Sequence, residues 1–352
     1  MESTENMFPW LGLLDRPAFC VKDGIVLAHN SAACSKGIEK GTDIRQIVTA
    51  HWDTYTEFEN GCLYLDVTIG EFPCKVCVTR TAEYDIFTLA QQEDTDSLQA
   101  LALAAQQLRI PLSNIMTATD RLLSDLDANV HEQQANQINR GLYQLLRIIS
   151  NMSDSGIYCP VPFVGMHTVN LTAVFSEIME KIQATANNVS VCYAGPDKPI
   201  LCLADEEKLE RAIYNLLSNA IKFAVPGSTI DTKLSQKSDL LSFTVCNTRA
   251  KDTQTDHFWN RYRREPAIED NRCGLGLGMT LISNIASAHG GTVLISHPSD
   301  TETRVTMTIA IRKDNSNTVR SPKLRVGDYA GGRDKALLEL ADILPIEAYN
   351  NI

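Results

Sequence analysis

Apolar residues recur at every second position through much of the first 90 residues. Two such segments, 18–22 and 25–29, flank Asp23 and Gly24, a pair typical of a tight hairpin turn. Residues 84–89 are a further candidate, and two longer segments carry these apolar positions: Leu63, Leu65, Val67 and Ile69, then Phe72, Cys74, Val76 and Val78. A period of two is typical of half-buried antiparallel strands. Helix-compatible residues lie between them, so we expect an α+β unit.

At about residue 94 the apolar period lengthens to that of a helix. Mostly apolar positions alternate three and four apart over about four heptads: Leu98, Leu101, Ala105, Leu108, Leu112, Ile115, Thr119, Leu122 and Leu126. After a polar break at 125–130 the spacing resumes: Ala135, Ile138, Leu142, Leu145, Ile149 and Met152. This pattern predicts a helical hairpin. One hairpin leaves its apolar stripe uncovered, so we expect a homodimer in which two hairpins form a four-helix bundle.

Beyond a proline-containing linker at 159–163, helix and strand signals alternate for about 145 residues. Asn170 is a plausible N-cap for one helix, and Asp205 opens another that extends to residue 223. Gly290 and Gly291 follow a third helix, as C-terminal glycines do. The tail from residue 313 is polar, with a short helix expected at 335–344.

Composition narrows the class of protein. The 352 residues carry 32 Lys and Arg against 43 Asp and Glu, a net charge of −11. This charge disfavours a nucleic-acid partner, because phosphate neutralisation dominates that affinity. No apolar run approaches the roughly 18 residues of a membrane span, and the acidic N-terminus lacks the apolar core of a secretory signal. We therefore expect a cytoplasmic protein whose ten cysteines are reduced.

Candidate chemistry lies on the helix 205–223 and on a later glycine-rich segment. Asn215, Asn219 and Lys222 form a polar stripe beside the helix's apolar face. Amide oxygens can ligate Mg²⁺ and a lysine can neutralise phosphate, although a solvated face would also hold such residues. Gly274 and Gly276, at a helix start, would let backbone approach phosphate closely. Each signal alone is weak evidence for nucleotide binding.

Together these segments resemble the motifs of the histidine-kinase (GHKL) ATPase family. Residues 215–224 (NLLSNAIKFA) are similar to its N box, 258–264 (FWNRYRR) to its F box and 274–279 (GLGLGM) to its second glycine box. They occur in the family's order, and residues 106–116 (QQLRIPLSNIM) resemble its H box. The resemblance covers about residues 94–312. The α+β unit before it weakly resembles a PAS-type sensor domain.

The resemblance implies an α+β multidomain protein that binds ATP and Mg²⁺. Its parts would be a PAS-like sensor at 1–93, a dimerisation hairpin at 94–158, an α/β sandwich ATP-binding domain at 159–312 and a polar tail at 313–352.

Carried over by position, the same resemblance assigns the candidate site. Asn215 would be the Mg²⁺ ligand, and Asn219 and Lys222 would contact the nucleotide phosphates. Tyr262 and Arg263 would lie in a lid, and Gly274 and Gly276 of the glycine-rich segment would line its hinge.

Three departures from the family pattern put kinase activity in doubt. Gln106 occupies the position of the phosphoacceptor histidine, and an amide nitrogen is not a nucleophile at neutral pH. Gln107 replaces the acidic neighbour expected to take a proton. The first glycine box is missing, and Asn247 stands where an aspartate would accept the adenine amino hydrogen. An asparagine carbonyl can still accept that bond, but without charge assistance.

The interpretation is a sensor-linked pseudokinase of a two-component system that binds nucleotide and engages a response regulator or a partner histidine kinase. One alternative is an active kinase that uses another acceptor, such as His131 near the turn of the hairpin. Others are a serine kinase or ATPase of the same superfamily, which would lack the heptad hairpin, or a non-catalytic ATP-dependent scaffold.

Overall fold

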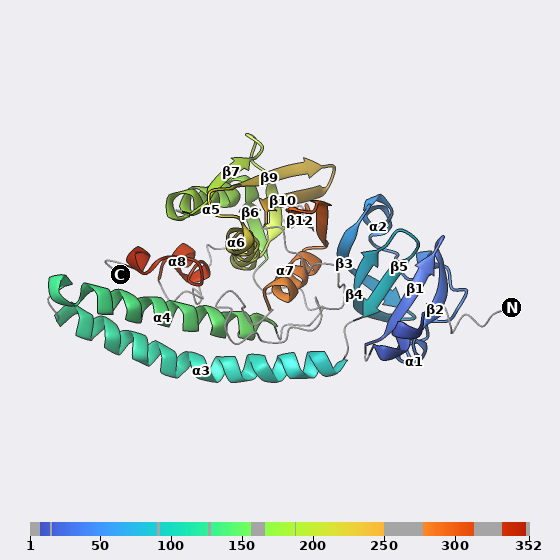
Figure 1. The fold of residues 1–352 in the computed structure, drawn as a ribbon, viewed down its shortest axis with the longest axis horizontal. Coiled ribbons are helices and arrows are strands. Elements are labelled where there is room, and N and C mark those ends of the chain that lie inside the picture. Colours follow the sequence, from blue (N-terminus) through green and yellow to red (C-terminus); the bar gives the residue numbers. More distant parts are fainter. Residues whose placement is uncertain are drawn as a thin grey trace.

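A ten-stranded, mostly antiparallel sheet runs through the molecule, and a long helical hairpin lies beside it (Figure 1). The computed structural model describes residues 8–14, 16–89, 92–125, 128–155, 166–186, 188–249, 277–312 and 333–349. The expected linker at 159–163 lies outside these residues. The mixed α/β class agrees with the sequence analysis.

The N-terminal unit consists of antiparallel strands with short helices between them. Its main elements are β1 (Ala18–Lys22), β2 (Ile25–His29), α1 (Ser31–Cys34), α2 (Trp52–Glu57), β3 (Gly61–Ile69), β4 (Phe72–Arg80) and β5 (Asp85–Leu89). Asp23 and Gly24 both have positive φ angles, so the expected hairpin turn is present. Phe19 and Phe87 stack 4.7 Å apart in the core of this unit.

Helices α3 (Gln92–Asp125) and α4 (Ala128–Ser155) form the expected hairpin. The predicted polar break at 125–130 is too long, because α3 reaches Asp125 and α4 already begins at Ala128. The apolar stripe is divided. Leu112, Leu142 and Ile149 are buried, whereas Leu108 and Leu145 are about half exposed. Part of the stripe therefore lacks a cover within the described part of one chain.

An α/β unit completes the sheet. Its elements are β6 (His167–Asn170), α5 (Leu171–Thr185), β7 (Ser190–Ala194), β8 (Leu201–Ala204), α6 (Glu206–Phe223), β9 (Thr229–Lys237), β10 (Leu240–Thr248), α7 (Leu277–Ala288), β11 (Val293–Ser299) and β12 (Glu302–Ala310). The predicted caps are confirmed: Asn170 accepts a hydrogen bond from the Ala173 amide, and Asp205 from that of Lys208. Strand β6 was not anticipated; it pairs with β8 in a separate two-stranded sheet.

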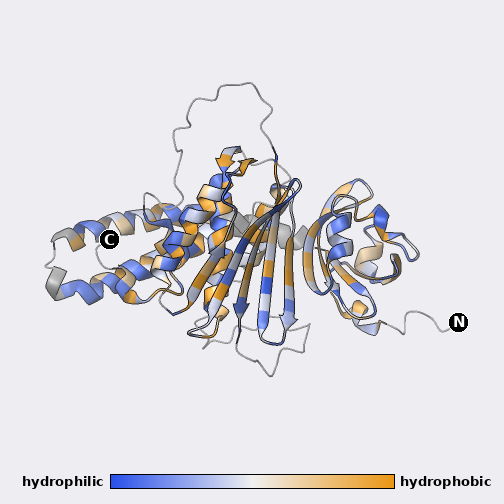
Figure 2. Ribbon diagram, turned by 90° about the horizontal axis from the view of Figure 1, so that it is seen from above, coloured by the Kyte–Doolittle hydropathy of each residue, from blue (hydrophilic) through white to orange (hydrophobic). Residues whose placement is uncertain are grey.

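The two units share one sheet because β3 pairs antiparallel with β11 (Figure 2). The partners are Tyr64 with Val293, Leu63 with Leu294, and Cys62 with Ile295. Gly61 begins β3 with φ +99°, and a Cβ there would lie 2.0 Å from the Ile295 carbonyl oxygen. Only glycine fits this close approach.

Side chains reinforce the junction between β11 and the N-terminal unit. The Lys75 ammonium donates to Oδ1 of Asn284 on α7 at 2.5 Å, and the Ser287 hydroxyl donates to Asp66 on β3. Burial lowers the pKa of Lys75 to about 8. The N-terminal unit therefore touches both β11 and α7 of the α/β unit.

Replacing Gly61 with alanine is expected to open this junction. The substitution combines an unfavourable positive φ with a clash against backbone, which together cost about 2–4 kcal/mol of folding stability. Urea denaturation followed by circular dichroism measures the loss. Gly70→Ala is the matched control, because Gly70 also has a positive φ of 63° but open space around its Cα. Equal destabilisation by both variants would contradict the importance of the close approach.

The C-terminal segment packs onto the body of the molecule beside α4 and α6 (Figure 1). Helix α8 (Lys335–Glu339) is shorter than the predicted 335–344, because the chain continues as a turn before the 3-10 helix Ile346–Tyr349. Leu338 and Tyr349 are fully buried, and the Tyr349 ring packs edge-on against Tyr143 of α4 at 5.3 Å. Among the described helices, none has both the length and the hydrophobicity that crossing a bilayer requires.

Candidate functional site

Helix α6 carries the N-box residues and forms for local reasons. Asp205 caps its N-terminus, acidic residues fill its first turn, and its expected apolar face is buried: Leu209, Ala212, Ile213, Leu216, Leu217 and Ala220. On the polar stripe, Asn219 and Lys222 are partly buried and Asn215 is only 3% exposed. Asn215 is therefore not part of a solvated face.

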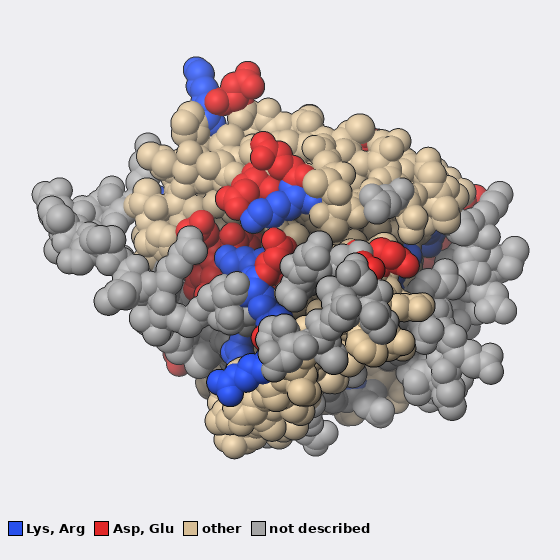
Figure 3. Space-filling view, turned by 90° about the vertical axis from the view of Figure 1, so that its left-hand side faces the viewer, with Lys and Arg blue, Asp and Glu red and all other residues tan. Residues whose placement is uncertain are grey.

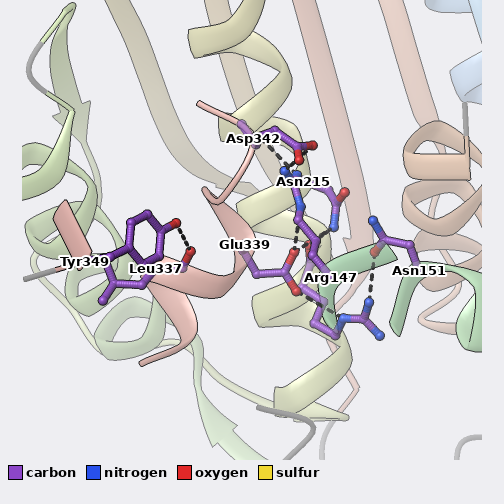
Figure 4. A network of polar contacts seen from close by, with 9 residues as sticks. Arg147, Asn151, Asn215, Leu337, Glu339, Asp342 and Tyr349 are labelled. Carbon is purple, nitrogen blue, oxygen red and sulfur yellow. Dashed lines mark hydrogen bonds and ion pairs between the residues drawn. The ribbon is translucent and has the colours of Figure 1, made fainter. Parts of the chain in front are cut away.

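The Asn215 amide lies between three elements. Its Nδ2 donates to the Arg211 carbonyl oxygen at 2.9 Å and makes a longer contact, 3.5 Å, with Oε2 of Glu339 on α8 (Figure 4). Its Oδ1 faces the first turn of α7, where a Cβ added to Gly278 would lie 3.3 Å away. The same Cβ would lie 3.8 Å from Nδ2 of Asn219. Two N-box asparagines therefore meet the start of α7, at a glycine of the glycine-rich segment.

Glu339 is fully buried between two arginines (Figure 4). Its Oε1 lies 3.2 Å from Nε of Arg211, and its Oε2 lies 3.6 Å from Nε of Arg147 on α4. Arg211 also donates to Oδ1 of Asn151 at 2.9 Å, and Arg147 pairs with Asp342 at 2.7 Å. The hairpin, the N-box helix and the C-terminal segment thus share one network, which the sequence analysis missed.

Ion pairs at the edge of the Glu339 network also hold the C-terminal segment. Lys335 pairs with Glu210 of α6, and Arg333 with Asp120 of α3 at 2.7 Å. Burial raises the pKa of Glu210, and the Lys335 ammonium opposes that rise. Figure 3 shows acidic and basic side chains lying side by side over this end of the molecule. The segment is therefore anchored by apolar burial and by charge.

Asn247, which the resemblance would place where the family has its adenine-binding aspartate, lies on β10. It is 6% exposed and shares a face of the sheet with Val245 and Phe243. Within the described part of the chain, its Nδ2 has no hydrogen-bond partner. A buried amide without a partner is costly in a folded protein and suits a site that a polar ligand completes.

His289 ties α7 to α6. Its Nε2 accepts from the backbone N–H of Asp205 at 3.1 Å, so its Nδ1 carries the hydrogen that is donated to the Ile285 carbonyl oxygen at 2.7 Å. Burial lowers the pKa of His289, which favours this neutral form. The bond joins the C-terminal end of α7 to the N-cap of α6.

The remaining candidate residues are placed only in part. Gln106 and Gln107 are exposed on α3. The lid residues Tyr262 and Arg263 and the hinge glycines Gly274 and Gly276 lie outside the described residues.

Comparison with known proteins agrees with these motifs. Residues 204–313 match the family described as histidine kinase-, DNA gyrase B-, and HSP90-like ATPase. The chain is a relative of the sensor histidine kinases. The resemblance predicted from the N box and the second glycine box is thereby confirmed.

Individual histidine kinases align with much of the chain. It is 27% identical over 227 residues to hybrid signal transduction histidine kinase D of Dictyostelium discoideum, which covers 61% of this chain and 15% of that protein. It is also 27% identical over 197 residues to the sensor protein KdpD of Clostridium acetobutylicum, covering 54% and 22%. The chain therefore spans less than a quarter of the length of these two relatives.

Among solved structures, that of full-length ShkA in complex with AMPPNP matches this chain with a TM-score of 0.49 and 17% sequence identity. The match covers 60% of this chain and 46% of that chain.

Proposed function

We propose that this protein binds ATP with Mg²⁺ and takes part in two-component signalling without phosphorylating its own hairpin. The observation that carries the proposal is the buried Asn215 amide, whose oxygen faces the start of α7. Asn219 faces the same turn. Amide oxygens suit Mg²⁺, and the N-terminal end of a helix suits phosphate.

The residues present fit the nucleotide as well as the metal. Asn215 would hold Mg²⁺, while Asn219 and Lys222 would contact phosphate. The Nδ2 of Asn247, which has no partner among the described residues, and its carbonyl would pair with the adenine edge. When bound, Mg²⁺ neutralises phosphate charge. Tyr262, Arg263, Gly274 and Gly276 would complete the lid and its hinge.

The proposed loss of autophosphorylation rests on the hairpin. Gln106 is exposed on α3 and supplies no nucleophilic nitrogen, and Gln107 beside it supplies no base. The protein would then act through binding, as a homodimer whose hairpins form a four-helix bundle. Its partner would be a response regulator or another histidine kinase. The N-terminal unit would be a PAS-like sensor, and the protein would reside in the cytoplasm.

Nucleotide binding is the direct test. We expect weak, Mg²⁺-dependent ATP binding with a Kd of tens of micromolar or poorer, roughly −6 kcal/mol. Asn215→Ala should remove the Mg²⁺ dependence, because the metal loses its protein ligand. Thermal shift and calorimetry with ATP in Mg²⁺ or EDTA measure both effects.

Asn284→Ala is the control for this test, since Asn284 is a buried asparagine whose Oδ1 binds Lys75 at the sheet junction. It should keep the Mg²⁺ dependence. A wild-type protein that shows no thermal shift at millimolar Mg-ATP would contradict the proposed function.

A further inference from the structure

The C-terminal segment, residues 333–349, packs against both the hairpin and helix α6, and it lies outside the residues that match the ATPase family. We infer that this segment is an electrostatic latch: the carboxylate of Glu339 holds the buried cations of Arg147 and Arg211 together and thereby fixes the α/β unit on the hairpin. The latch concerns how these two units are arranged, and it does not depend on nucleotide binding.

The two cations come from different units. Arg147 lies on α4 of the hairpin and is 5% exposed, and Arg211 lies on α6 of the α/β unit and is 2% exposed. Arg147 donates across the interface to the Ser218 hydroxyl of α6 at 2.9 Å. Arg211 donates in the other direction, to Oδ1 of Asn151 on α4, also at 2.9 Å. Buried charges of the same sign are costly unless anions lie beside them, so this docked arrangement needs negative charge at the interface.

The C-terminal segment supplies that negative charge (Figure 4). Glu339 is fully buried, and its two carboxylate oxygens lie 3.2 Å from Nε of Arg211 and 3.6 Å from Nε of Arg147. Asp342 makes a second ion pair with Arg147 at 2.7 Å. Both of these carboxylates belong to the C-terminal segment. If the segment moved away, the two buried cations would lose them, and the hairpin and α6 would separate.

Aromatic packing places the segment at this interface. The Tyr349 ring packs edge-on against Tyr143 of α4 at 5.3 Å, and the Arg333 guanidinium lies 5.5 Å from the centre of the Tyr143 ring. Tyr143 is only 1% exposed, so the segment shields an aromatic side chain of the hairpin. Release of the latch would therefore uncover Tyr143 as well as free the α/β unit.

Glu339→Gln tests the latch, because it removes the charge and keeps the size of the side chain. Amide hydrogen exchange on the full chain measures local opening. We expect exchange in residues 140–151 of α4 to become about 10-fold faster or more, since loss of one partner of a buried ion pair is strongly destabilising. Exchange in β9 and β10 should stay within about twofold, which distinguishes undocking from general unfolding. Small-angle X-ray scattering should show a larger radius of gyration.

Removing one cation tests whether charge is responsible. Arg211→Met eliminates the second cation and leaves Arg147 paired with Asp342. In the Glu339→Gln background, we expect Arg211→Met to return exchange in α4 to within about twofold of wild type, because the repulsion is gone. If Glu339 contributed only packing, the double variant would be at least as open as Glu339→Gln.

Asp85→Asn is the matched control, because Asp85 is another buried carboxylate paired with an arginine, Arg80, but lies in the N-terminal unit. It should leave exchange in residues 140–151 unchanged. Unchanged exchange there in Glu339→Gln, or no recovery in the double variant, would overturn the latch. Should Glu339→Gln fail to fold, Asp342→Asn replaces it as a milder variant, since the Asp342 side chain is 33% exposed. It must also speed exchange in α4, or the latch is wrong.

Discussion

Wild-type protein incubated with radiolabelled ATP is expected to acquire no acid-labile phosphate, whereas the Gln106→His/Gln107→Glu variant should become labelled slowly. The histidine supplies a nucleophile with a pKa near 6.5, and the glutamate supplies a base, a contribution of about 10²–10⁴-fold. Both positions are exposed on α3, so the substitutions leave the core intact.

Labelling of this variant should stay slow because Asn247, the proposed adenine contact, offers no charged acceptor. Misplacement of the reacting groups by about 1 Å can cost 100-fold. Adding Asn247→Asp should raise the rate. Gln134→His, on the exposed part of α4, is the control and should remain unlabelled. Phosphohistidine on any of the seven native histidines at useful stoichiometry would refute the pseudokinase interpretation and favour another acceptor.

Leu108→Glu/Leu145→Glu is expected to convert a dimer into a monomer. In a single chain these side chains are 49% and 50% exposed, so glutamate there costs little folding stability. In a four-helix bundle the same positions would be covered, and unpaired buried charges would cost several kcal/mol. Light scattering at micromolar concentration measures the change in mass.

Leu13→Glu is the control for this experiment, because Leu13 is 82% exposed and lies outside the hairpin. It should leave the mass unchanged. A wild type that is already monomeric at micromolar concentration would refute dimerisation through the hairpin.

Local patterns predicted most of the elements. The Asp23-Gly24 turn, the caps at Asn170 and Asp205, and the glycines after α7 act over a few residues, so the sequence reveals them directly. The N box could be recognised for the same reason, since its residues share one helix. The structure adds that Asn215 is buried, which periodicity alone did not decide.

Contacts between distant segments were not predictable in this way. Strands β3 and β11 lie more than 200 residues apart along the chain. The alternation of apolar and polar residues in each strand does not show which strand lies beside it. The short helix that carries Glu339 was expected, but nothing in the sequence near Glu339 indicates its partners Arg147 and Arg211. Such pairings depend on how whole elements pack.

The shared sheet gives the N-terminal unit a second connection to the α/β unit. One path follows the chain along α3, and the other crosses the β3–β11 hydrogen bonds to the strand directly after α7. A change in the shape of β3 would reach α7 without passing through the hairpin. Cutting the chain before α3 would consequently leave two fragments that stay associated, joined edge to edge by backbone.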